Sequence, residues 1–394
     1  MTILSVNAGS SSLKFSLYPY IDSGIQPQIL NGCIEGLEPG GKPEMSWTLR
    51  GQSGRRTLAL VAGPVFAQAL QGLADFLAQL PDVPTILAVA HRVVHGGDRF
   101  RASVIVTDEV LQQLDAMVDL APLHQPHNVA GIRAFRQTFD RIPQVACFDT
   151  AFHATLPEVD YRFALPDALY QQGLRRYGFH GLSYQYVMGV LQQHCRRADG
   201  RVLMAHLGNG ASLCAALGGK SCSTTMGFSA LDGLVMGTRT GSLDAGVMLY
   251  LLQHGYDHDR LQKLLYQQSG LLGVSGVSAD MRTLRSDKSD AARLAIDMFG
   301  YRLLRESGAL VACMQGLDVL AFSGGIGEHD TALRADMALR LGWLGVAVDA
   351  DLNARATGSD IMAIHAPHSQ VEVWVVPTDE GLVAAREAVR LMAH

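Results

Sequence analysis

A short turn rich in glycine, serine and asparagine occurs twice in this chain of 394 residues. The first copy is VNAGSSSLK at residues 6–14, and the second is HLGNGAS at residues 206–212. Each copy lies between short apolar runs, which predicts a β-hairpin with the polar residues at its tip. Such a tip offers backbone N–H groups and small hydroxyls to phosphate oxygens. One copy alone could be an ordinary turn, but the pair, with Lys14 beside the first copy, predicts two related halves that bind one polyphosphate.

Two arginines have neighbours that are unusual for surface ion pairs. Arg92 lies at the polar end of the apolar run 86–94, and Arg239 lies between glycines in GTRTG at residues 237–241. An enzyme that transfers a phosphoryl group to a carboxylate must hold two anions close together. The planar guanidinium group suits this task, because its N–H groups match carboxylate and phosphate oxygens and it stays charged. We therefore predict that both arginines bind the reacting groups, with a surface ion pair as the alternative for each.

Two carboxylates end apolar strand patterns. Asp149 follows the run 144–148, and Glu380 follows the run 371–376 after a short polar segment. Carboxylates in these positions suit Mg²⁺, which phosphoryl transfer needs to neutralise the β- and γ-phosphate oxygens. For Glu380 the alternative is a carboxylate that only stabilises the N-terminus of the last predicted helix.

His180 is the histidine most suggestive of chemistry. It lies between an aromatic residue and a glycine in YGFHG at residues 177–181, where it could donate to a migrating phosphoryl group. The other histidines are predicted to be structural. His124 and His127 flank Pro126, so we expect them not to share a helix face and predict no zinc site.

A glycine cluster, SGGIG at residues 323–327, follows the apolar run 319–322 and precedes a predicted helix. A helix N-terminus behind glycines can accept the phosphates of a nucleotide. A glycine turn without any ligand is the alternative.

Composition excludes several classes of protein. The chain is 48% apolar and 18% charged, and its net charge of −5 argues against a nucleic-acid partner. It has no apolar run of about 18 residues and no signal-peptide pattern at its start, so no membrane association is predicted. The six cysteines are scattered without a CxxC pair, which is typical of buried thiols in a reducing cytoplasm.

Hydrophobic periodicity predicts mixed strands and helices in two similar halves, with a cleft between them. Helices are predicted over 65–80, 107–120, 186–194, 291–315 and 381–392, and strands or hairpins over 1–20, 86–94, 144–148, 202–217, 319–322 and 371–376. We place one domain over 1–149, with the C-terminal helix 381–394 packing back on it, and the other over 150–380.

These motifs together resemble the acetate kinase family, within the superfamily that also contains sugar kinases and actin-like ATPases. The resemblance covers essentially the whole chain and rests on ten segments in family order. They are VNAGSSSLKF at 6–15, HRVVHGG at 91–97, APLHQPHN at 121–128, FDTAFH at 148–153, RYGFHG at 176–181, HLGNGAS at 206–212, MGFSALDGLVMGTRTG at 226–241, SADMR at 278–282, FSGGIGE at 322–328 and PTDEG at 377–381.

The resemblance implies a role for each matching residue. Catalysis falls to Arg92, Arg239, Asp149 and His180, and the acyl group lies against Val94, Leu123, Phe179 and Ala230. The metal is served by Asn7 and Glu380, with Asp149 less directly. The nucleotide is bound by Ser10, Ser12, Lys14, His206, Asn209, Gly210, Asp280, Met281, Arg282, Gly325, Ile326 and Gly327. The implied fold is a duplicated ribonuclease-H-like, actin-like ATPase pair of α/β domains that closes on ligand in a homodimer.

The chain departs from the family pattern at four places. Ala230 stands where the family usually has proline at the wall of the acyl pocket, and its loss of a ring could enlarge that pocket. The other departures are Tyr184, Met281 and His329. None belongs to the phosphoryl-transfer residues, so they bear on acyl and nucleotide preference only.

The sequence therefore predicts a cytoplasmic acetate kinase that interconverts ATP plus acetate with ADP plus acetyl phosphate. Its cofactor is predicted to be Mg²⁺, with Mn²⁺ as an alternative metal. A propionate kinase of the same family is the first alternative: Val94 favours acetate, whereas Ala230 favours a larger acid. A non-catalytic, actin- or Hsp70-like nucleotide switch is the second alternative, and the two arginines argue against it.

Overall fold

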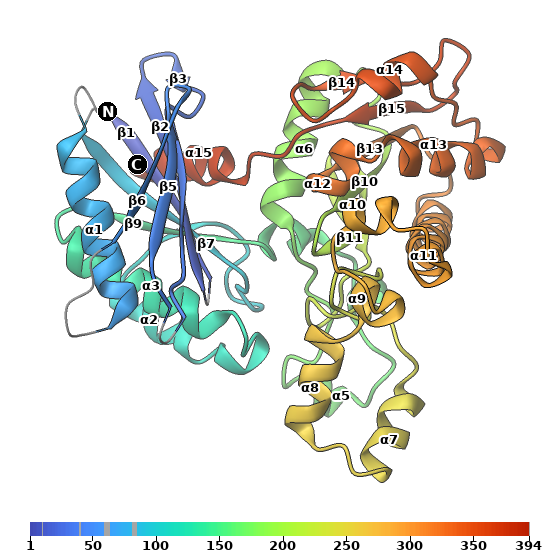
Figure 1. Ribbon diagram of the computed structural model, residues 1–394, viewed down its shortest axis with the longest axis horizontal. Helices are drawn as coiled ribbons and strands as arrows, with labels where there is room; N and C mark the ends of the chain where they lie inside the picture. Colours follow the sequence, from blue (N-terminus) through green and yellow to red (C-terminus); the bar gives the residue numbers. More distant parts are fainter. Residues whose placement is uncertain (10, 39–40, 59–63, 81–84, 394) are drawn as a thin grey trace. The chain divides into compact units, whose positions relative to one another are not determined.

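The computed structural model of the chain describes residues 1–9, 11–38, 41–58, 64–80 and 85–393 (Figure 1). The chain divides into two compact units: unit 1 consists of Met1–Ala151 and Asp379–His394, and unit 2 of Phe152–Thr378. We expected Glu380 at the end of the second domain, but it lies in unit 1. The reason is that Glu380 begins helix α15 (Glu380–Met392), which packs on strands of unit 1.

Unit 1 is built on one large sheet whose strands follow the order β6-β5-β4-β2-β1-β7-β9-β8, with β3 paired to β2. The hairpin strands β1 and β2 are antiparallel, whereas β7 runs parallel to β1 and β9 parallel to β7. The strands are β1 (Thr2–Ala8), β2 (Ser12–Ile21), β3 (Gly24–Ile25), β4 (Leu30–Glu35), β5 (Glu44–Leu49), β6 (Gln52–Thr57), β7 (Ile86–Val93), β8 (Val104–Ile105) and β9 (Gln144–Phe148).

Helices cover both faces of the central strands of unit 1. The helices are α1 (Val65–Gln79), α2 (Asp108–Asp115), η1 (Val118–Leu120), α3 (Gln125–Thr138) and α15, and η2 (Ala151–Thr155) leads out of the unit. Leu70 and Leu73 of α1 and Phe135 of α3 are buried with the β1–β2 hairpin in one apolar core. On α15, the small residues Ala384, Ala385 and Ala388 are buried, and this helix packs against β1 and β7. Small side chains allow the helix to lie close to the sheet.

Unit 2 repeats this plan with a sheet of order β12-β11-β10-β13-β15-β14. Its strands are β10 (Arg201–Leu207), β11 (Ala211–Leu217), β12 (Lys220–Thr224), β13 (Val319–Ser323), β14 (Met362–Ala363) and β15 (Glu372–Val375). Its helices are α4 (Glu158–Tyr161), α5 (Asp167–Tyr170), α6 (Gly181–His194), α7 (Ala245–Gln253), α8 (His258–Gln267), α9 (Gly270–Ser275), α10 (Met281–Ser286), α11 (Asp290–Met314), α12 (Gly324–His329), α13 (Thr331–Arg340), η3 (Gly342–Leu344) and α14 (Ala350–Arg355). Val187 and Leu191 of α6 are buried against the sheet strands in one apolar core, and α11 packs on strands β10 to β12.

The two sheets share a five-strand core with the same connectivity. In chain order the core strands of unit 1 are β1, β2, β4, β7 and β9, and those of unit 2 are β10, β11, β12, β13 and β15. In both units the spatial order is third, second, first, fourth and fifth, with the first three antiparallel and the last two parallel to the first. The predicted α/β duplication is therefore confirmed.

Two predicted elements differ from the structure. The helix predicted over 107–120 is broken into α2 and η1, because the backbone leaves the helix at Met117 and its side chain enters an apolar cluster with Phe100 and Phe148. Helix α3 is absent from the predicted elements. His124 and His127 were expected not to share a helix face: His124 is the N-cap of α3, but His127 lies in the helix, so for His127 the expectation is wrong. Pro126 occupies the first turn of α3, where a missing backbone N–H leaves no hydrogen bond unmade. Among the described residues, no helix has the length and apolar character needed to cross a membrane.

Candidate functional site

In unit 1 the structure brings together Arg92, Asp149 and Glu380, which lie far apart in the sequence. The Nε and Nη2 groups of Arg92 donate to the two carboxylate oxygens of Asp149, at 2.9 and 2.6 Å. One carboxylate oxygen of Glu380 lies 3.4 Å from Arg92 Nε. The bidentate pair fixes the plane of the guanidinium group, as the planar fork of arginine requires.

The carboxyl ends of two parallel strands place Arg92 and Asp149, and the start of helix α15 places Glu380. Arg92 lies near the end of β7, and Asp149 directly follows β9, where its N–H donates to the Val93 carbonyl at 3.0 Å. Glu380 begins α15, whose N-cap is Asp379. The Asp379 carboxylate accepts from the Leu382 N–H at 2.9 Å and from the Tyr18 hydroxyl at 2.6 Å. The first contact caps α15, and the second ties its start to strand β2 of the sheet.

The charge of Arg92 is secured by its neighbours. Burial opposes the charge on this guanidinium, but the carboxylates of Asp149 and Glu380 outweigh burial and raise the pKa of Arg92 above its already high value. Its remaining nitrogen, Nη1, makes no hydrogen bond to the described residues. Arg92 can therefore offer Nη1 to an anion while Asp149 keeps the side chain in place.

The first polar turn leads from β1 into β2. Asn7 pairs with Lys14 across the hairpin, and the Gly9 N–H donates to the Ser12 carbonyl at 2.8 Å. Lys14 is exposed and lines an open hollow of about 730 Å³ on the face of the sheet. The predicted nucleotide residue Ser10 lies outside the described residues.

Asn128 is a residue of unit 1 that sequence reasoning missed. Its Nδ2 donates to the Ala8 carbonyl at 2.9 Å, and its Oδ1 accepts from the Val94 N–H at 3.0 Å. It thus ties the first polar turn to Val94, one of the two half-buried unit 1 residues predicted to line the acyl pocket, the other being Leu123. The available signal was its place as the last residue of APLHQPHN.

In unit 2 the structure brings together His180, Arg239 and the tip of the second hairpin. A Cβ atom at Gly210 would lie 2.9 Å from Arg239 Nη2 and 3.2 Å from His180 Nε2. Only glycine allows both nitrogens to come so close to this backbone. The His180 ring also stacks on the His206 ring, with 4.2 Å between centroids. Asn209 is exposed at the same tip.

His180 has a strained backbone. Its φ of 59° and ψ of 23° lie in the left-handed region, which residues with a Cβ rarely adopt. Its ring is fixed by the Ser212 hydroxyl, 2.9 Å from Nδ1, and Ser212 is in turn 2.5 Å from the Tyr184 hydroxyl. Because Nδ1 is engaged with Ser212, Nε2 is the nitrogen that faces Arg239. Tyr184, one of the departures from the family pattern, therefore helps to orient His180.

His153 binds the backbone of the residue that precedes His180. The sequence alone predicts only a structural role for this histidine. Its Nε2 donates to the Phe179 carbonyl at 2.9 Å, and its Nδ1 lies 2.8 Å from the Ser221 hydroxyl. Burial lowers the pKa of His153 to about 4, so its ring is neutral at neutral pH. Phe179, predicted to line the acyl pocket, is itself buried.

Arg239 is oriented by the loop that contains Ala230. Its Nη1 donates to the Ala230 carbonyl at 2.6 Å. The segment before Arg239 is tied to the tip of the second hairpin, because the Gly237 N–H donates to the Asn209 carbonyl at 3.0 Å. Ala230 therefore makes its hydrogen bond to Arg239 through its backbone carbonyl, and not through its side chain.

The glycine cluster forms the start of α12 and lies against the second hairpin. Gly324 has a φ of 74°, and a Cβ there would lie 2.8 Å from the Leu207 carbonyl oxygen. Gly325 has open space around its Cα, which agrees with close approach of a ligand, whereas Gly327 is buried. Ile326 lies between them, half-buried.

The predicted adenosine residues lie at the start of α10. Asp280 caps this helix and pairs with Arg282, whose guanidinium holds the pKa of the Asp280 carboxyl at about 2. The Met281 side chain is buried, so it is Asp280 and Arg282 that reach the surface.

The donors for a metal ion are few. Among the described residues, no three His, Cys, Asp or Glu side chains gather closely enough to hold a metal alone. The pair Asp149 and Glu380 offers hard carboxylate oxygens. Arg92 donates to both oxygens of Asp149 but lies near only one oxygen of Glu380, so Glu380 is more available to a metal ion. Such a set fits Mg²⁺, which usually takes one or two carboxylates plus phosphate oxygens and water.

Comparison with known proteins places this fold among kinases. The crystal structure of Porphyromonas gingivalis acetate kinase has a TM-score of 0.89 and 35% identity, over 99% of each chain. The structure of a propionate kinase from Francisella tularensis subsp. tularensis SCHU S4 has a TM-score of 0.90 and 34% identity, over 98% of each chain.

The chain belongs to the Acetokinase family, whose model matches residues 2–386. A curated relative named acetate kinase, from Rhodopseudomonas palustris (strain ATCC BAA-98 / CGA009), is 48% identical over 393 residues, which cover 99% of this chain and 98% of the relative. Another acetate kinase, from Methylocella silvestris, is 43% identical over 99% of this chain and 98% of its own length. The resemblance inferred from the motifs is therefore confirmed.

The support of the strained histidine can be tested at Gly178. A Cβ at this position would lie 2.6 Å from the His153 ring and 2.8 Å from the Thr224 methyl group. The Gly178→Ala variant must therefore move the backbone two residues before His180, and we expect kcat to fall by at least about 10-fold. Steady-state kinetics and thermal unfolding are the measurements.

Gly218→Ala is the matched control. Gly178 has a positive φ of 76°, and Gly218 has one of 57°, but a Cβ at Gly218 would meet nothing within 4 Å. This variant carries the left-handed backbone cost of about 1 kcal/mol without the clash, so its kcat should match that of the wild type. If Gly178→Ala retained wild-type kcat as well, the His153 support would be irrelevant to catalysis.

Proposed function

We propose that this chain catalyses the reversible, Mg²⁺-dependent transfer of the γ-phosphoryl group of ATP to acetate, giving acetyl phosphate and ADP. Its family and its 48% identity to a protein named acetate kinase support this activity. The observation that carries the proposal is the convergence of Arg239 Nη2 and His180 Nε2 on the glycine tip of a phosphate-type hairpin. An assay of acyl phosphate formed from ATP, Mg²⁺ and acetate, trapped as the hydroxamate, tests it directly.

The reaction needs little covalent work from the protein. A carboxylate oxygen of acetate attacks the γ-phosphorus in line, so that a P–O bond forms while the bond to the bridging oxygen of ADP breaks. Arg92 and Arg239 bind the acetate carboxylate and the moving phosphoryl group, and His180 donates from Nε2 to a phosphoryl oxygen. Charge stabilisation and positioning supply the rate enhancement.

The metal is assigned to the carboxylate pair of unit 1. Glu380 would bind Mg²⁺ more directly than Asp149, with Asn7 as a further oxygen donor. The bound ion would neutralise the phosphate oxygens. Mn²⁺ is an acceptable substitute, because the same hard oxygen ligands bind both ions.

Propionate is the second candidate substrate. Ala230 lacks the ring that the family usually places at the pocket wall, and a solved propionate kinase is similar in structure. Val94 nevertheless leaves less room than a smaller residue would. Since one methylene is worth only about 1–3 kcal/mol in a hydrophobic pocket, acetate should be preferred while propionate is still converted.

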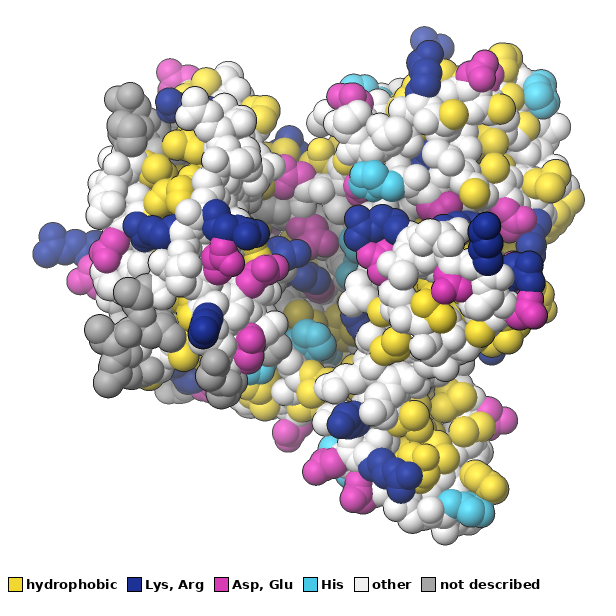
Figure 2. All heavy atoms as spheres, in the orientation of Figure 1, with side chains coloured by type: hydrophobic (Ala, Val, Ile, Leu, Met, Phe, Trp, Pro, Cys, Tyr) yellow, Lys and Arg dark blue, Asp and Glu magenta, His cyan; other side chains and the backbone are white. Residues whose placement is uncertain are grey.

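We also propose that the enzyme forms a homodimer, with α7 at the interface. No residue of this apolar helix is buried, and Figure 2 shows hydrophobic side chains gathered over α7 and α8. Leu249 is 62% exposed, and Tyr250 and Leu252 are at least half exposed. A contiguous apolar patch of this kind marks an interface rather than a solvated surface. Location in the cytoplasm is supported by six cysteines that form no disulfide, and cell fractionation would test it.

The two arginines provide the first test of the activity. Arg92→Ala and Arg239→Ala should fold normally and lose about 10²–10⁴-fold in kcat, as when an oxyanion donor or arginine finger is removed. Lysine at either position should restore activity only in part, since a point charge does not reproduce the fork. The control is Arg133→Ala, which removes an exposed ion pair on α3. An alanine variant that keeps more than about a third of wild-type turnover would show that the arginine has another role.

Glu380→Ala tests the metal assignment. Its apparent Mg²⁺ requirement should rise, or its turnover should collapse at every Mg²⁺ concentration, because a direct ligand is lost. Glu387→Ala, on the same helix and paired with Arg390, is the control and should leave the Mg²⁺ titration unchanged. If Glu380 only stabilises the helix N-terminus, its loss costs about 0.3–1 kcal/mol of stability and the Mg²⁺ dependence stays constant.

Substrate preference is tested at the acyl pocket. Val94→Ala should lower the ratio of kcat/KM for acetate over propionate, and Ala230→Pro should raise it, by up to about 1–3 kcal/mol. The Ala230 N–H makes no hydrogen bond to the described residues, so proline removes none there. Val110→Ala, on α2, is the control for loss of a valine elsewhere. A wild-type enzyme that converts propionate more efficiently than acetate would establish the alternative substrate.

The interface assignment predicts a change of mass. The wild type should sediment as a dimer, and Leu249→Asp should sediment as a monomer because a charge would be buried against the partner. Leu339→Asp on α13, at a residue that is 81% exposed, should remain dimeric. A monomeric wild type at micromolar concentration would refute the assignment.

A further inference from the structure

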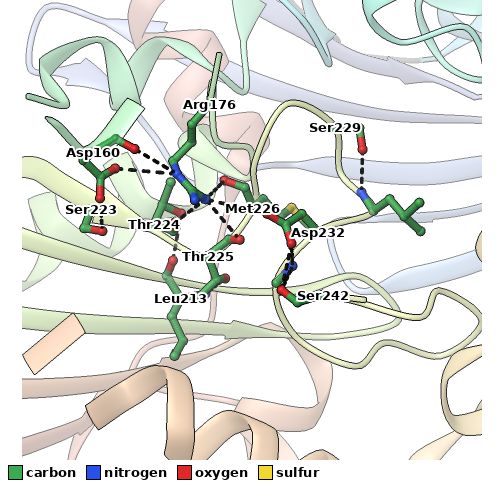
Figure 3. Close-up of polar contacts among 12 residues, drawn as sticks. Asp160, Arg176, Leu213, Ser223, Thr224, Thr225, Met226, Ser229, Asp232 and Ser242 are labelled. Atoms are coloured by element: carbon green, nitrogen blue, oxygen red, sulfur yellow. Dashed lines mark hydrogen bonds and ion pairs between the residues drawn. The ribbon is translucent and has the colours of Figure 1, made fainter. Parts of the chain in front are cut away.

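Arg176, in the segment before His180, has a side chain that the functional assignment does not use. It points into the bend where β12 leads into the loop of residues 225–242, and Figure 3 shows its guanidinium group surrounded by oxygen atoms. Its side chain is 20% exposed.

The guanidinium group grips consecutive backbone carbonyls. Nη1 lies 3.0 Å from the Thr224 oxygen, 3.4 Å from the Thr225 oxygen and 3.0 Å from the Met226 oxygen. Nε donates to the Asp160 carbonyl at 3.3 Å, and the Asp160 carboxylate lies 3.7 Å away. One side chain thus fixes the last residue of β12 and the first two residues of the loop.

The backbone beside Arg176 adds a second connection. The N–H groups of Tyr177 and Gly178 both point at the Gly227 carbonyl, at 3.0 and 3.3 Å. The segment that ends in His180 and the segment that begins the loop are therefore joined by side-chain and backbone bonds together.

The far part of the loop is closed by Asp232. Its Oδ1 accepts from the Gly233 N–H at 2.8 Å and from the Ser242 hydroxyl at 2.7 Å. Its Oδ2 lies 3.9 Å from Arg176 Nη1. Arg176 and Asp232 thus bracket the stretch that contains Ala230, whose carbonyl receives the hydrogen bond from Arg239.

We propose that Arg176 is a positioning residue, which holds the loop of residues 225–242 so that the Ala230 carbonyl orients the guanidinium group of Arg239. The inference rests on the proposed function through the role of Arg239. Arginine suits the task because its donors lie in one rigid plane and reach four carbonyls at once. Lysine offers a flexible point charge and cannot reproduce this arc of contacts.

The expected size of the effect follows from geometry. Displacement of a substrate-binding group by about 1 Å, caused by a change away from the chemistry, can cost about 10²-fold in rate. We expect Arg176→Lys to lower kcat/KM for acetate by about 10- to 100-fold. The KM for ATP should change by less than about threefold, because the nucleotide residues lie outside this loop.

A double-mutant cycle separates positioning from general stability. Arg176→Lys, Arg239→Lys and the double variant are assayed with acetate, ATP and Mg²⁺. In the Arg239→Lys background the side chain can no longer make the guanidinium contact with Ala230. The Arg176→Lys change should therefore cost less than about threefold there, although it costs 10-fold or more in the wild type.

An equal factor in both backgrounds, or a loss below about threefold in the wild type, would overturn the positioning role. Full activity of Arg239→Lys and of Arg239→Ala would instead overturn the proposed role of Arg239 itself. Arg201→Lys is the matched control: Arg201 is in the same unit, binds Asp318 with two nitrogens and donates to the Gln315 carbonyl. Its kcat/KM should stay within about twofold of the wild type.

A second variant covers the case in which Arg176→Lys does not fold. Ser242→Ala removes the hydroxyl that bridges Asp232 and Gly233 at the other end of the same loop. The same cycle with Arg239→Lys should again show a smaller loss in the variant background. Equal losses would count against the loop as the element that orients Arg239.

Discussion

A guanidinium group that leaves water must find oxygen partners for its N–H groups, and this constraint organises both units. Arg92 meets it with two carboxylates, Arg239 with a backbone carbonyl, and Arg176 with a row of carbonyls. Arg334 is wholly buried and donates only to neutral oxygens, four of them backbone carbonyls and one the side chain of Asn353. Most of these partners are backbone carbonyl oxygens, so the path of the backbone determines where each buried guanidinium group can lie.

Hydrogen bonds to neighbouring residues also explain how the structure keeps His180 in a strained conformation. A left-handed conformation at His180 costs free energy of the order of 1–3 kcal/mol and persists only where its surroundings leave no easier arrangement. Here the residue before it is bonded to His153, its ring to Ser212, and its own carbonyl to the first turn of α6. These contacts hold both the backbone and the ring of His180 in this conformation.

Much of this arrangement could be predicted from the sequence, for identifiable reasons. Polar residues that end apolar runs, such as Arg92 and Asp149, mark the carboxyl ends of strands, and the repeated turn marks the duplication. Arg176 and Asn128 lie within the motifs RYGFHG and APLHQPHN, but the sequence did not indicate what they bind. Arg176 bonds to carbonyls 48 to 50 residues away, and Asn128 joins segments 120 and 34 residues away. Backbone carbonyls carry no residue identity, so such partners are invisible before folding. Helix α3 was missed because Pro126 was interpreted as a helix breaker, whereas proline is tolerated in the first turn of a helix.

Unit 1 is discontinuous in the chain: its sheet comes from residues before Phe152, and α15 comes after Thr378. Synthesis runs from the N-terminus, so the whole of unit 2 is synthesised before α15. Until then the apolar surface of β1 and β7 that Ala384 and Ala388 cover is open, and Arg92 has Asp149 but not Glu380 beside it. The first unit to be made is therefore the last to be completed, and no shortened product that ends within unit 2 can carry both Asp149 and Glu380.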